Sequence, residues 1–287
     1  MKILVPLPSR DFDPTEVAVS WKILAAEGNE LVFATPDGAA AATDPVMISG
    51  EGLDVWGFIP GLKKLKLIGL ALRAHAPARE AYGLLERDAR FLKPLSYAQL
   101  RMSDFDALLL PGGHAKGMRP YLEDKNLQAV VADFFDAGKP VAAVCHGVVL
   151  AARSISKKTG KSVLHGRRTT ALTWKLEKSG WDLTRFFARF WDPGYYRTYG
   201  EEPGQPAGYM SVQQEVTRAL AAPSDFRDVD ADAPHHFMKS SGVFRDSASD
   251  ERPAWVVRDG KYISARWPGD VHTFAKQFAG LLKEQTP

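Results

Sequence analysis

The single cysteine of the chain, Cys145, stands at a junction between two sequence patterns. The preceding residues 141–144 form an apolar run typical of a buried strand, and the small or apolar residues after Cys145 predict a helix. Such a strand-to-helix elbow exposes a nucleophile at the carboxyl edge of a sheet. The helix N-terminus stabilises a thiolate, and its backbone amides can bind an oxyanion. We therefore expect Cys145 to be a reactive nucleophile with a thiol pKa well below about 8.5. The alternative is an inert buried cysteine.

A turn-forming motif, Pro111-Gly112-Gly113-His114, closes the preceding predicted strand. Because the carboxyl ends of parallel strands meet at one edge of a sheet, we expect this turn to lie near Cys145. Its flexible glycine backbone can point an amide at the carbon that Cys145 attacks. As structure alone, a Pro-Gly-Gly turn is common. Two strand-end motifs that converge on one edge are a more specific signal than either alone.

Glu16 lies just beyond the end of another predicted strand, in the first turn of a helix. The run Asp13-Pro14-Thr15-Glu16 supplies an N-cap residue, a proline at the first helical position and an acid at the third. In one interpretation, Glu16 completes a capping box and has only a structural role. In the other, its carboxyl hydrogen-bonds Cys145 and donates or accepts the thiol proton.

The other polar clusters favour simpler interpretations. Asp270 and His272 begin the last predicted helix, where we expect capping and surface roles. His235-His236 lacks further ligands at useful spacing, so we expect no metal site. We expect a turn at His165-Gly166-Arg167-Arg168 and a solvated helix face at Lys63, Lys64 and Lys66. Two interpretations stay open for a further group of residues, which either line a pocket or pack on the core: Tyr195, Tyr196, Arg197 and Tyr199.

The elements that position these residues alternate between strands and helices. Apolar runs and capping signals predict strands at 2–5, 30–35, 106–110, 141–144 and 168–172, with helices at 13–27, 126–137 and 271–282. Asp259-Gly260 between two apolar runs predicts a hairpin. This alternation is typical of an α/β fold with a mostly parallel sheet and helices on both faces. We expect one domain over residues 1–287, with insertions at about 50–100 and 190–250.

Composition excludes several classes of protein. The 287 residues are 45% hydrophobic and 25% charged, the balance of a globular protein. A net charge of +3 is too small to indicate nucleic acid as a partner. One cysteine allows no intramolecular disulfide. Residues 2–5 are too short a run for a signal-peptide core, and no apolar stretch approaches the roughly 18 residues of a membrane span. We expect a soluble, cytoplasmic protein without membrane contact.

Taken together, three motifs resemble the ThiJ/PfpI superfamily, whose members share the core of class I glutamine amidotransferases. They are the early Glu16, the Pro-Gly-Gly-His turn at 111–114 and the Ala-Val-Cys-His-Gly elbow at 143–147. The terminal hairpin and helix also resemble this family, and the length of the chain is nearer to the larger heat-shock glyoxalase/chaperone branch. The resemblance implies a flavodoxin-like three-layer sandwich with a nucleophile elbow.

The resemblance also implies roles for individual residues. Cys145 would be the nucleophile, and Glu16 the carboxyl beside it. Gly113 and His146 would give backbone amides to the oxyanion hole, and the His146 side chain would serve as the base. Some members add an acid that orients this histidine, from the strand after the elbow helix. The corresponding residues 169–174 contain no acid.

The function that the resemblance implies is a cofactor-independent, cysteine-dependent reaction on a small carbonyl compound. In a glyoxalase III-like reaction, Cys145 would add to an aldehyde such as methylglyoxal to give a hemithioacetal, and Glu16 or His146 would move the protons. Two alternatives stay open. One is a hydrolase or amidotransferase-like enzyme that forms a thioester, and the other is a chaperone or cysteine oxidation sensor without turnover. The sequence leaves open whether the protein is a homodimer.

Overall fold

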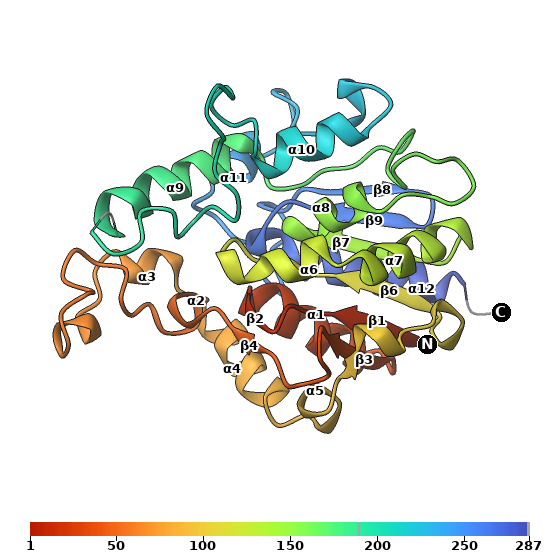
Figure 1. The fold of residues 1–287 in the computed structure, drawn as a ribbon, viewed down its shortest axis with the longest axis horizontal. Helices are drawn as coiled ribbons and strands as arrows, with labels where there is room; N and C mark the ends of the chain where they lie inside the picture. The colour runs from red at the N-terminus through yellow and green to blue at the C-terminus, as the bar shows by residue number, and fades with distance from the viewer. Residues whose placement is uncertain (189, 286–287) are drawn as a thin grey trace.

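A seven-stranded sheet forms the centre of the computed structural model, which describes residues 1–188 and 190–285 (Figure 1). The strand order is β5-β3-β1-β6-β7-β9-β8, and every neighbouring pair is parallel except β8 and β9. The strands are β1 (Lys2–Pro6), β3 (Glu30–Thr35), β5 (Leu95–Ser96), β6 (Ala107–Leu110), β7 (Val141–Val144), β8 (Val256–Asp259) and β9 (Tyr262–Ala265). A separate parallel pair joins β2 (Arg10–Phe12) to β4 (Ala42–Thr43).

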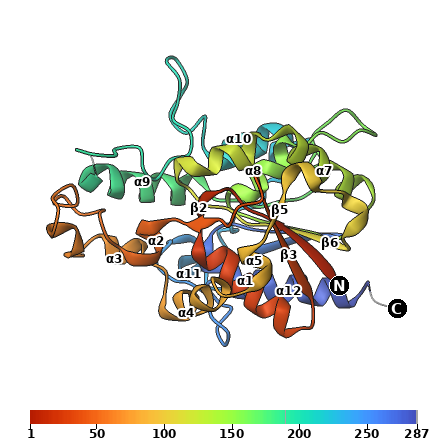
Figure 2. The same cartoon turned by 60° about the horizontal axis from the view of Figure 1, so that its bottom comes forward.

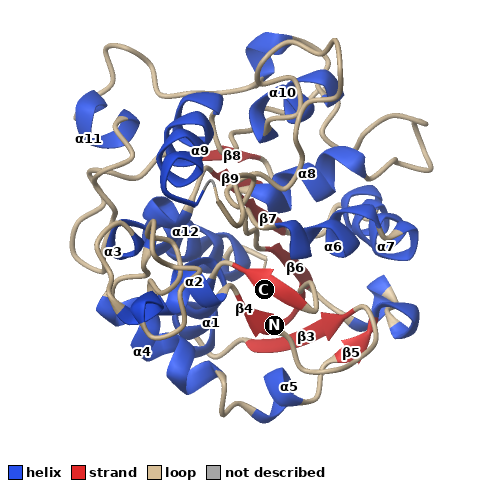
Figure 3. Ribbon diagram, turned by 60° about the vertical axis from the view of Figure 1, so that its left-hand side comes forward, coloured by secondary structure: helices blue, strands red, loops and turns tan. Residues whose placement is uncertain are grey.

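Helices cover both faces of the sheet, as Figures 2 and 3 show. One layer contains α1 (Pro14–Ala26), α4 (Ala76–Leu85) and α12 (Val271–Lys283). The other contains α6 (Arg119–Glu123), α7 (Lys125–Asp136), α8 (His146–Arg153) and α10 (Val212–Ala219). The fold is therefore the expected flavodoxin-like α/β sandwich with a mostly parallel sheet.

Local sequence signals account for the elements that lead to the site. The Asp13 carboxylate caps α1, accepting hydrogen bonds from the backbone amides of Thr15 (2.7 Å) and Glu16 (3.0 Å). Gly28, with a φ of 77°, ends this helix in the left-handed conformation that glycine adopts without strain. The hairpin predicted around Asp259-Gly260 is also confirmed, because β8 and β9 pair on either side of this turn.

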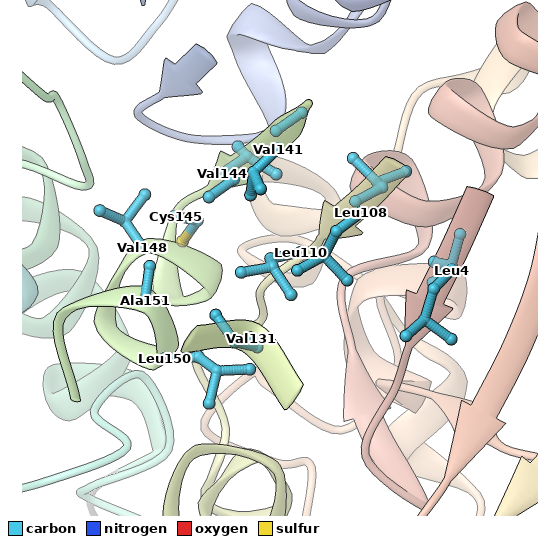
Figure 4. Packing of buried hydrophobic residues seen from close by; sticks show 14 of the residues in the cluster. Leu4, Leu108, Leu110, Val131, Val141, Val144, Cys145, Val148, Leu150 and Ala151 are labelled. Carbon is cyan, nitrogen blue, oxygen red and sulfur yellow. The ribbon is translucent and has the colours of Figure 1, made fainter. Parts of the chain in front are cut away.

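Part of the core lies where the sheet meets α7 and α8. Figure 4 shows Leu108 and Leu110 of β6 and Val144 of β7 packed towards Val131 and Val148 of these two helices. All five side chains are fully buried. Strands that are apolar on every residue are typical of a parallel sheet covered on both faces. The packed strands therefore fix the positions of the loops that follow β6 and β7.

The expected strand at residues 168–172 is wrong. Only Thr169 forms an isolated bridge, with Phe226. Its hydroxyl lies 2.9 Å from that of Tyr262, and the Thr170 amide donates to the Ser264 hydroxyl (3.0 Å). Side-chain contacts to β9 thus replace the backbone ladder that a strand would need.

The two expected insertions contain short helices. Within residues 50–100, α4 packs on α1 and β5 pairs with β3, whereas the part that includes α3 (Gly69–Leu72) extends to the left in Figure 1. Other short helices are α2 (Pro45–Ser49), α5 (Ala89–Leu92) and α11 (His236–Ser240). Helix α9 (Trp174–Ala188) precedes the second insertion. Within the described residues, no helix is long and apolar enough to cross a membrane.

Candidate active site

Cys145 occupies a strained backbone position between β7 and α8. Its φ of 55° and ψ of −123° lie outside the usual regions for a residue with a side chain. Two glycines permit this turn. A Cβ on Gly147 would collide with the carbonyl oxygen of Leu110, and a Cβ on Gly112 would lie 2.6 Å from the His146 amide nitrogen. The predicted nucleophile elbow is therefore present, with its glycines required by close backbone contacts.

Glu16 connects helix α1 to the turn after β6. Its Oε2 accepts a hydrogen bond from the Gly112 amide at 2.6 Å, while the Gly112 carbonyl accepts one from the Asp13 amide at 2.9 Å. A capping box would instead direct the Glu16 carboxyl to the Asp13 amide. The capping-box interpretation is therefore wrong. Glu16 is fully buried, and its carboxyl lies within hydrogen-bonding reach of the Cys145 side chain.

The electrostatic environment raises the pKa values of both Glu16 and Cys145. For Glu16, burial is the largest cause and the neighbouring Asp13 carboxylate is the next. For Cys145, burial again comes first, followed by the charges of Glu16 and Asp13, while the His146 backbone amide acts in the opposite direction. The pKa of the Cys145 thiol is therefore raised, and the expected value well below about 8.5 is wrong. Burial and two carboxyl groups outweigh the helix N-terminus.

The imidazole of His146 lies against the thiol. Its Nδ1 is 3.4 Å from Cys145 Sγ, and its Nε2 is 3.0 Å from the Thr198 hydroxyl. Because Thr198 donates its own proton to the His114 carbonyl (2.8 Å), this hydroxyl accepts from His146 Nε2. The Nδ1 atom is then free of a proton and faces the thiol. Burial lowers the pKa of His146 to about 3, so the ring is neutral at physiological pH.

Thr198 is the hydrogen-bond partner of the His146 ring, and the sequence offered no signal for it. It lies within residues 190–250, in an irregular segment without periodicity. The neighbouring Arg197 fixes this segment, because its buried guanidinium contacts Glu177 of α9 at 3.2 Å and Glu201 at 2.6 Å. The segment also brings Tyr196 into the site, where its ring stacks on His114 with centroids 4.2 Å apart. Of the three tyrosines and Arg197, only Tyr196 lines the pocket beside Cys145.

A pocket of about 440 Å³ opens beside Cys145, with Glu16 and Gly113 in its lining. Among the described residues the Gly113 amide has no hydrogen-bond acceptor, and the His146 amide lies against Cys145 Sγ. The His146 side chain does not line this pocket. Much of the rest of the wall comes from residues 50–100 and 190–250 and from α9, including Leu72, His75, Leu176, Tyr196 and Arg245. Both segments therefore contribute to the pocket beside the cysteine.

A family model described as ThiJ/PfpI family-like matches residues 7–202, more than half of the chain. The chain belongs to the ThiJ/PfpI family. The match contains Glu16, the turn at 111–114, the elbow and Thr198, so the residues around the thiol all lie in its range. Arg245 lies outside it.

Three known proteins are similar to this chain. A deglycase of Pyrococcus abyssi is 36% identical over 189 residues, which cover 66% of this chain and 69% of that protein. An uncharacterized protein of Schizosaccharomyces pombe is 26% identical over 136 residues, 47% of this chain and only 45% of the relative. Glyoxalase III from Candida albicans has a similar fold, with a TM-score of 0.60, 16% identity, and coverage of 98% of this chain and 97% of that one.

The remaining candidates lie outside this ThiJ/PfpI site. Asp270 is not a surface residue, because it is fully buried and its Oδ1 lies 2.7 Å from Arg266 Nη2. His236 Nδ1 lies 2.8 Å from the Asp230 carbonyl, on an exposed segment. Within residues 1–188 and 190–285, no three His, Cys, Asp or Glu side chains are placed to hold a metal ion.

Proposed function

We propose that this protein is a cysteine-dependent enzyme that converts a 2-oxoaldehyde, such as methylglyoxal, into a 2-hydroxy acid, as in a glyoxalase III-like reaction. One observation carries the proposal. Cys145 and Glu16 line one pocket, and the neutral imidazole of His146, which does not line that pocket, faces the thiol. A thiol, a base for its proton and a second proton carrier are the groups that this reaction needs. Family membership and the deglycase and glyoxalase III relatives support a carbonyl substrate.

In the first step, the thiol proton moves to His146 Nδ1 as the sulfur forms a bond to the aldehyde carbon. The carbonyl oxygen then takes up that proton to complete a hemithioacetal. We assign the backbone amides of Gly113 and His146 as the hydrogen-bond donors to this oxygen. A thiol with a raised pKa needs such a base, because little thiolate exists before the substrate arrives.

The next steps move a proton between two adjacent carbons. A base removes the proton from the former aldehyde carbon, the electron pair forms an enediol, and the neighbouring carbon receives a proton. The product is a thioester of a 2-hydroxy acid, and water then cleaves it to the acid and the free thiol. Overall, one dicarbonyl and one water give one 2-hydroxy acid. We assign the proton transfer to Glu16, because its carboxyl lines the pocket and the His146 side chain does not.

The same geometry disfavours an oxidation sensor. Sensor cysteines are exposed and have lowered pKa values, whereas Cys145 is only 4% exposed and its pKa is raised. A deglycase activity is the second candidate, because relatives that share 35–36% identity over 189 residues carry that name. It would use the same thiol attack on a carbonyl-derived carbon.

The test is turnover of methylglyoxal by the wild type and by Cys145→Ser, with the 2-hydroxy acid measured directly. We expect the product to form with the wild type alone, and circular dichroism should show both proteins folded. A methylglyoxal adduct of a free amino acid, assayed in parallel, distinguishes the deglycase candidate. Equal turnover by both proteins, or none by the wild type, would overturn the glyoxalase proposal.

A further inference from the structure

The pocket beside Cys145 is larger than a three-carbon dicarbonyl requires. Its volume of about 440 Å³ falls in the range of roughly 300–1,000 Å³ typical of sites that enclose a drug-sized ligand. Apolar side chains make up much of the wall, among them Leu72, Leu172, Leu176, Leu183, Val243 and Trp267. The pocket therefore accommodates a carbonyl compound with an apolar body several carbons long.

One cation in this pocket, Arg245, makes no direct ion pair or hydrogen bond with an acid among the described residues. Its Nη1 atom is completely buried and makes no hydrogen bond. The guanidinium lies over the Trp267 ring, 5.3 Å from the ring centroid, and it forms no ion pair with any carboxylate among residues 1–188 and 190–285. Arginine stays protonated at physiological pH, and a buried guanidinium without a partner is costly. An anionic ligand would remove that cost.

The position of Arg245 is fixed by the next residue along the chain. Asp246 accepts hydrogen bonds from the amides of His272 (3.2 Å) and Thr273 (2.7 Å) at the start of α12, and its own amide donates to the Gly269 carbonyl (2.8 Å). The loop that carries Arg245 is therefore anchored to a helix of the core. A guanidinium held in this way is ready to receive a ligand without rearrangement.

We propose that Arg245 binds a carboxylate of the substrate, so that the protein acts on an oxo acid: a 2-oxoaldehyde whose apolar chain ends in a carboxylate. This inference rests on the proposed function and names its substrate class. A planar guanidinium matches a carboxylate through two parallel hydrogen bonds. Arg245 lies beyond the residues 7–202 that the family model matches.

The groups that face Arg245 favour a singly charged ligand. Asp13, Tyr196 and His75 all interact with it electrostatically. Burial raises the pKa of Asp13 to about 6, so this carboxylate is mostly ionised at neutral pH and offsets part of the positive charge. A phosphate dianion would meet more repulsion there than a carboxylate would.

The kinetic test compares 4,5-dioxopentanoate with 2-oxopentanal, which has the same carbon chain and no carboxylate. With water, the first gives 2-hydroxyglutarate and the second 2-hydroxypentanoate, with no other reactant. We expect wild-type kcat/KM to favour the acid by roughly 10- to 100-fold, mainly through KM, as a charge-assisted pair would. Arg245→Gln should bring the ratio of the two kcat/KM values close to one, and Arg245→Lys should give an intermediate ratio. The control is Arg252→Gln, which changes an exposed arginine outside the pocket and should keep the wild-type ratio. A preference that survives Arg245→Gln would overturn the proposal.

A binding experiment keeps this inference separate from the proposed activity. Isothermal titration calorimetry of the Cys145→Ser protein with pentanoate, 1-pentanol and inorganic phosphate needs no turnover. We expect pentanoate to bind at least 10-fold more tightly than 1-pentanol, and Arg245→Gln to abolish the difference. That result would support the carboxylate site even if neither dicarbonyl were turned over. Equal binding of pentanoate and 1-pentanol, or tighter binding of phosphate than of pentanoate, would overturn it.

Discussion

At the scale of single residues, the balance between burial and the helix N-terminus decides how Cys145 works. The N-terminal field of a helix contributes about 0.3–1 kcal/mol, less than one pKa unit. Full burial of an ionisable group shifts its pKa by up to about 3–5 units. Since Cys145 is buried beside Asp13 and Glu16, the thiol pKa rises. The neutral His146 offers a positioned acceptor, because its Nδ1 atom faces the sulfur and can take the proton as the sulfur attacks.

The raised pKa predicts a thiol that is slow to alkylate at neutral pH. We expect the rate of reaction of Cys145 with iodoacetamide to increase through pH 7 to 9, without a plateau below about pH 8.5, the value of an ordinary thiol. Because Cys145 is the only cysteine, labelling followed by intact-mass spectrometry reports on it alone. A plateau near pH 6 would show that the helix N-terminus controls the thiol after all.

Glu16→Gln tests whether this carboxyl moves protons. The charge of Glu16 is the largest electrostatic contribution that raises the Cys145 pKa after burial, so its removal should lower that pKa. Turnover should fall by roughly 10²–10⁴-fold, the range for a lost general acid–base group. Glu27→Gln at the exposed C-terminal end of α1 is the matched control and should change neither quantity. If Glu16→Gln also leaves both unchanged, Glu16 only holds the Gly112 turn, and His146 is the remaining candidate base.

Thr198→Val tests the orientation of the imidazole. Valine has nearly the same shape but removes the acceptor for His146 Nε2 and the donor to the His114 carbonyl. We expect kcat to fall by roughly 10- to 100-fold, less than complete loss of a general base, with an altered pH profile of kcat. Stability should fall by about 1–3 kcal/mol because two buried polar groups lose their partner. Thr217→Val, at a position whose hydroxyl donates to the Gln213 carbonyl of its own helix, should leave the pH profile as it is in the wild type.

At the scale of elements, the sequence predicted the site residues whose positions follow from regular strands and helices. Apolar runs and glycine-rich ends located the strands and brought Glu16, Gly113 and Cys145 to one edge of the sheet. Thr198 and Arg245 could not be found in this way, because they lie in irregular segments whose course depends on long-range contacts such as those of Arg197 with α9 and of Asp246 with α12. The strand expected at 168–172 failed for a related reason: side-chain hydrogen bonds to β9 satisfy this segment instead.

Gly147→Ala tests the elbow as an element. Its new Cβ would collide with the backbone carbonyls of Leu110 and Pro111, which cannot move without displacing β6. We expect a loss of about 1–3 kcal/mol in the free energy of unfolding, as for other overpacked sites, together with loss of turnover. Gly280→Ala in α12 meets no atom within 4 Å, so it should stabilise the protein by about 0.5–1 kcal/mol. Chemical denaturation of both variants measures the contrast, and equal stabilities would contradict the steric argument.

At the scale of the whole molecule, the segment of residues 190–250 is anchored by buried polar contacts near the pocket. It is attached twice, through Arg197 to Glu177 and through Asp246 to the start of α12. These anchors place Thr198 and Arg245, so the shape of the pocket depends on them. Burial raises the pKa of Asp246 to about 7. The protonation of this anchor therefore couples the stability of the whole chain to pH.

The sign of this coupling is set by the two states of Asp246. An unfolded aspartate has a pKa near 3.9, so between about pH 4 and pH 7 the folded protein holds a proton on Asp246 that the unfolded chain releases. Its contribution to stability is therefore complete below pH 4 and is lost as the pH rises through 7.

Asp246→Asn removes this titration. Relative to the variant, the wild type should lose roughly 1–3 kcal/mol of unfolding free energy between pH 5 and pH 8, measured by urea denaturation at each pH. Asp250→Asn is the control, because the pKa of Asp250 is lowered to about 2 by Arg252 and its effect should be constant over this range. A constant difference between the wild type and Asp246→Asn across the same range would show that Asp246 is ionised in the folded protein throughout, and that its pKa is not raised.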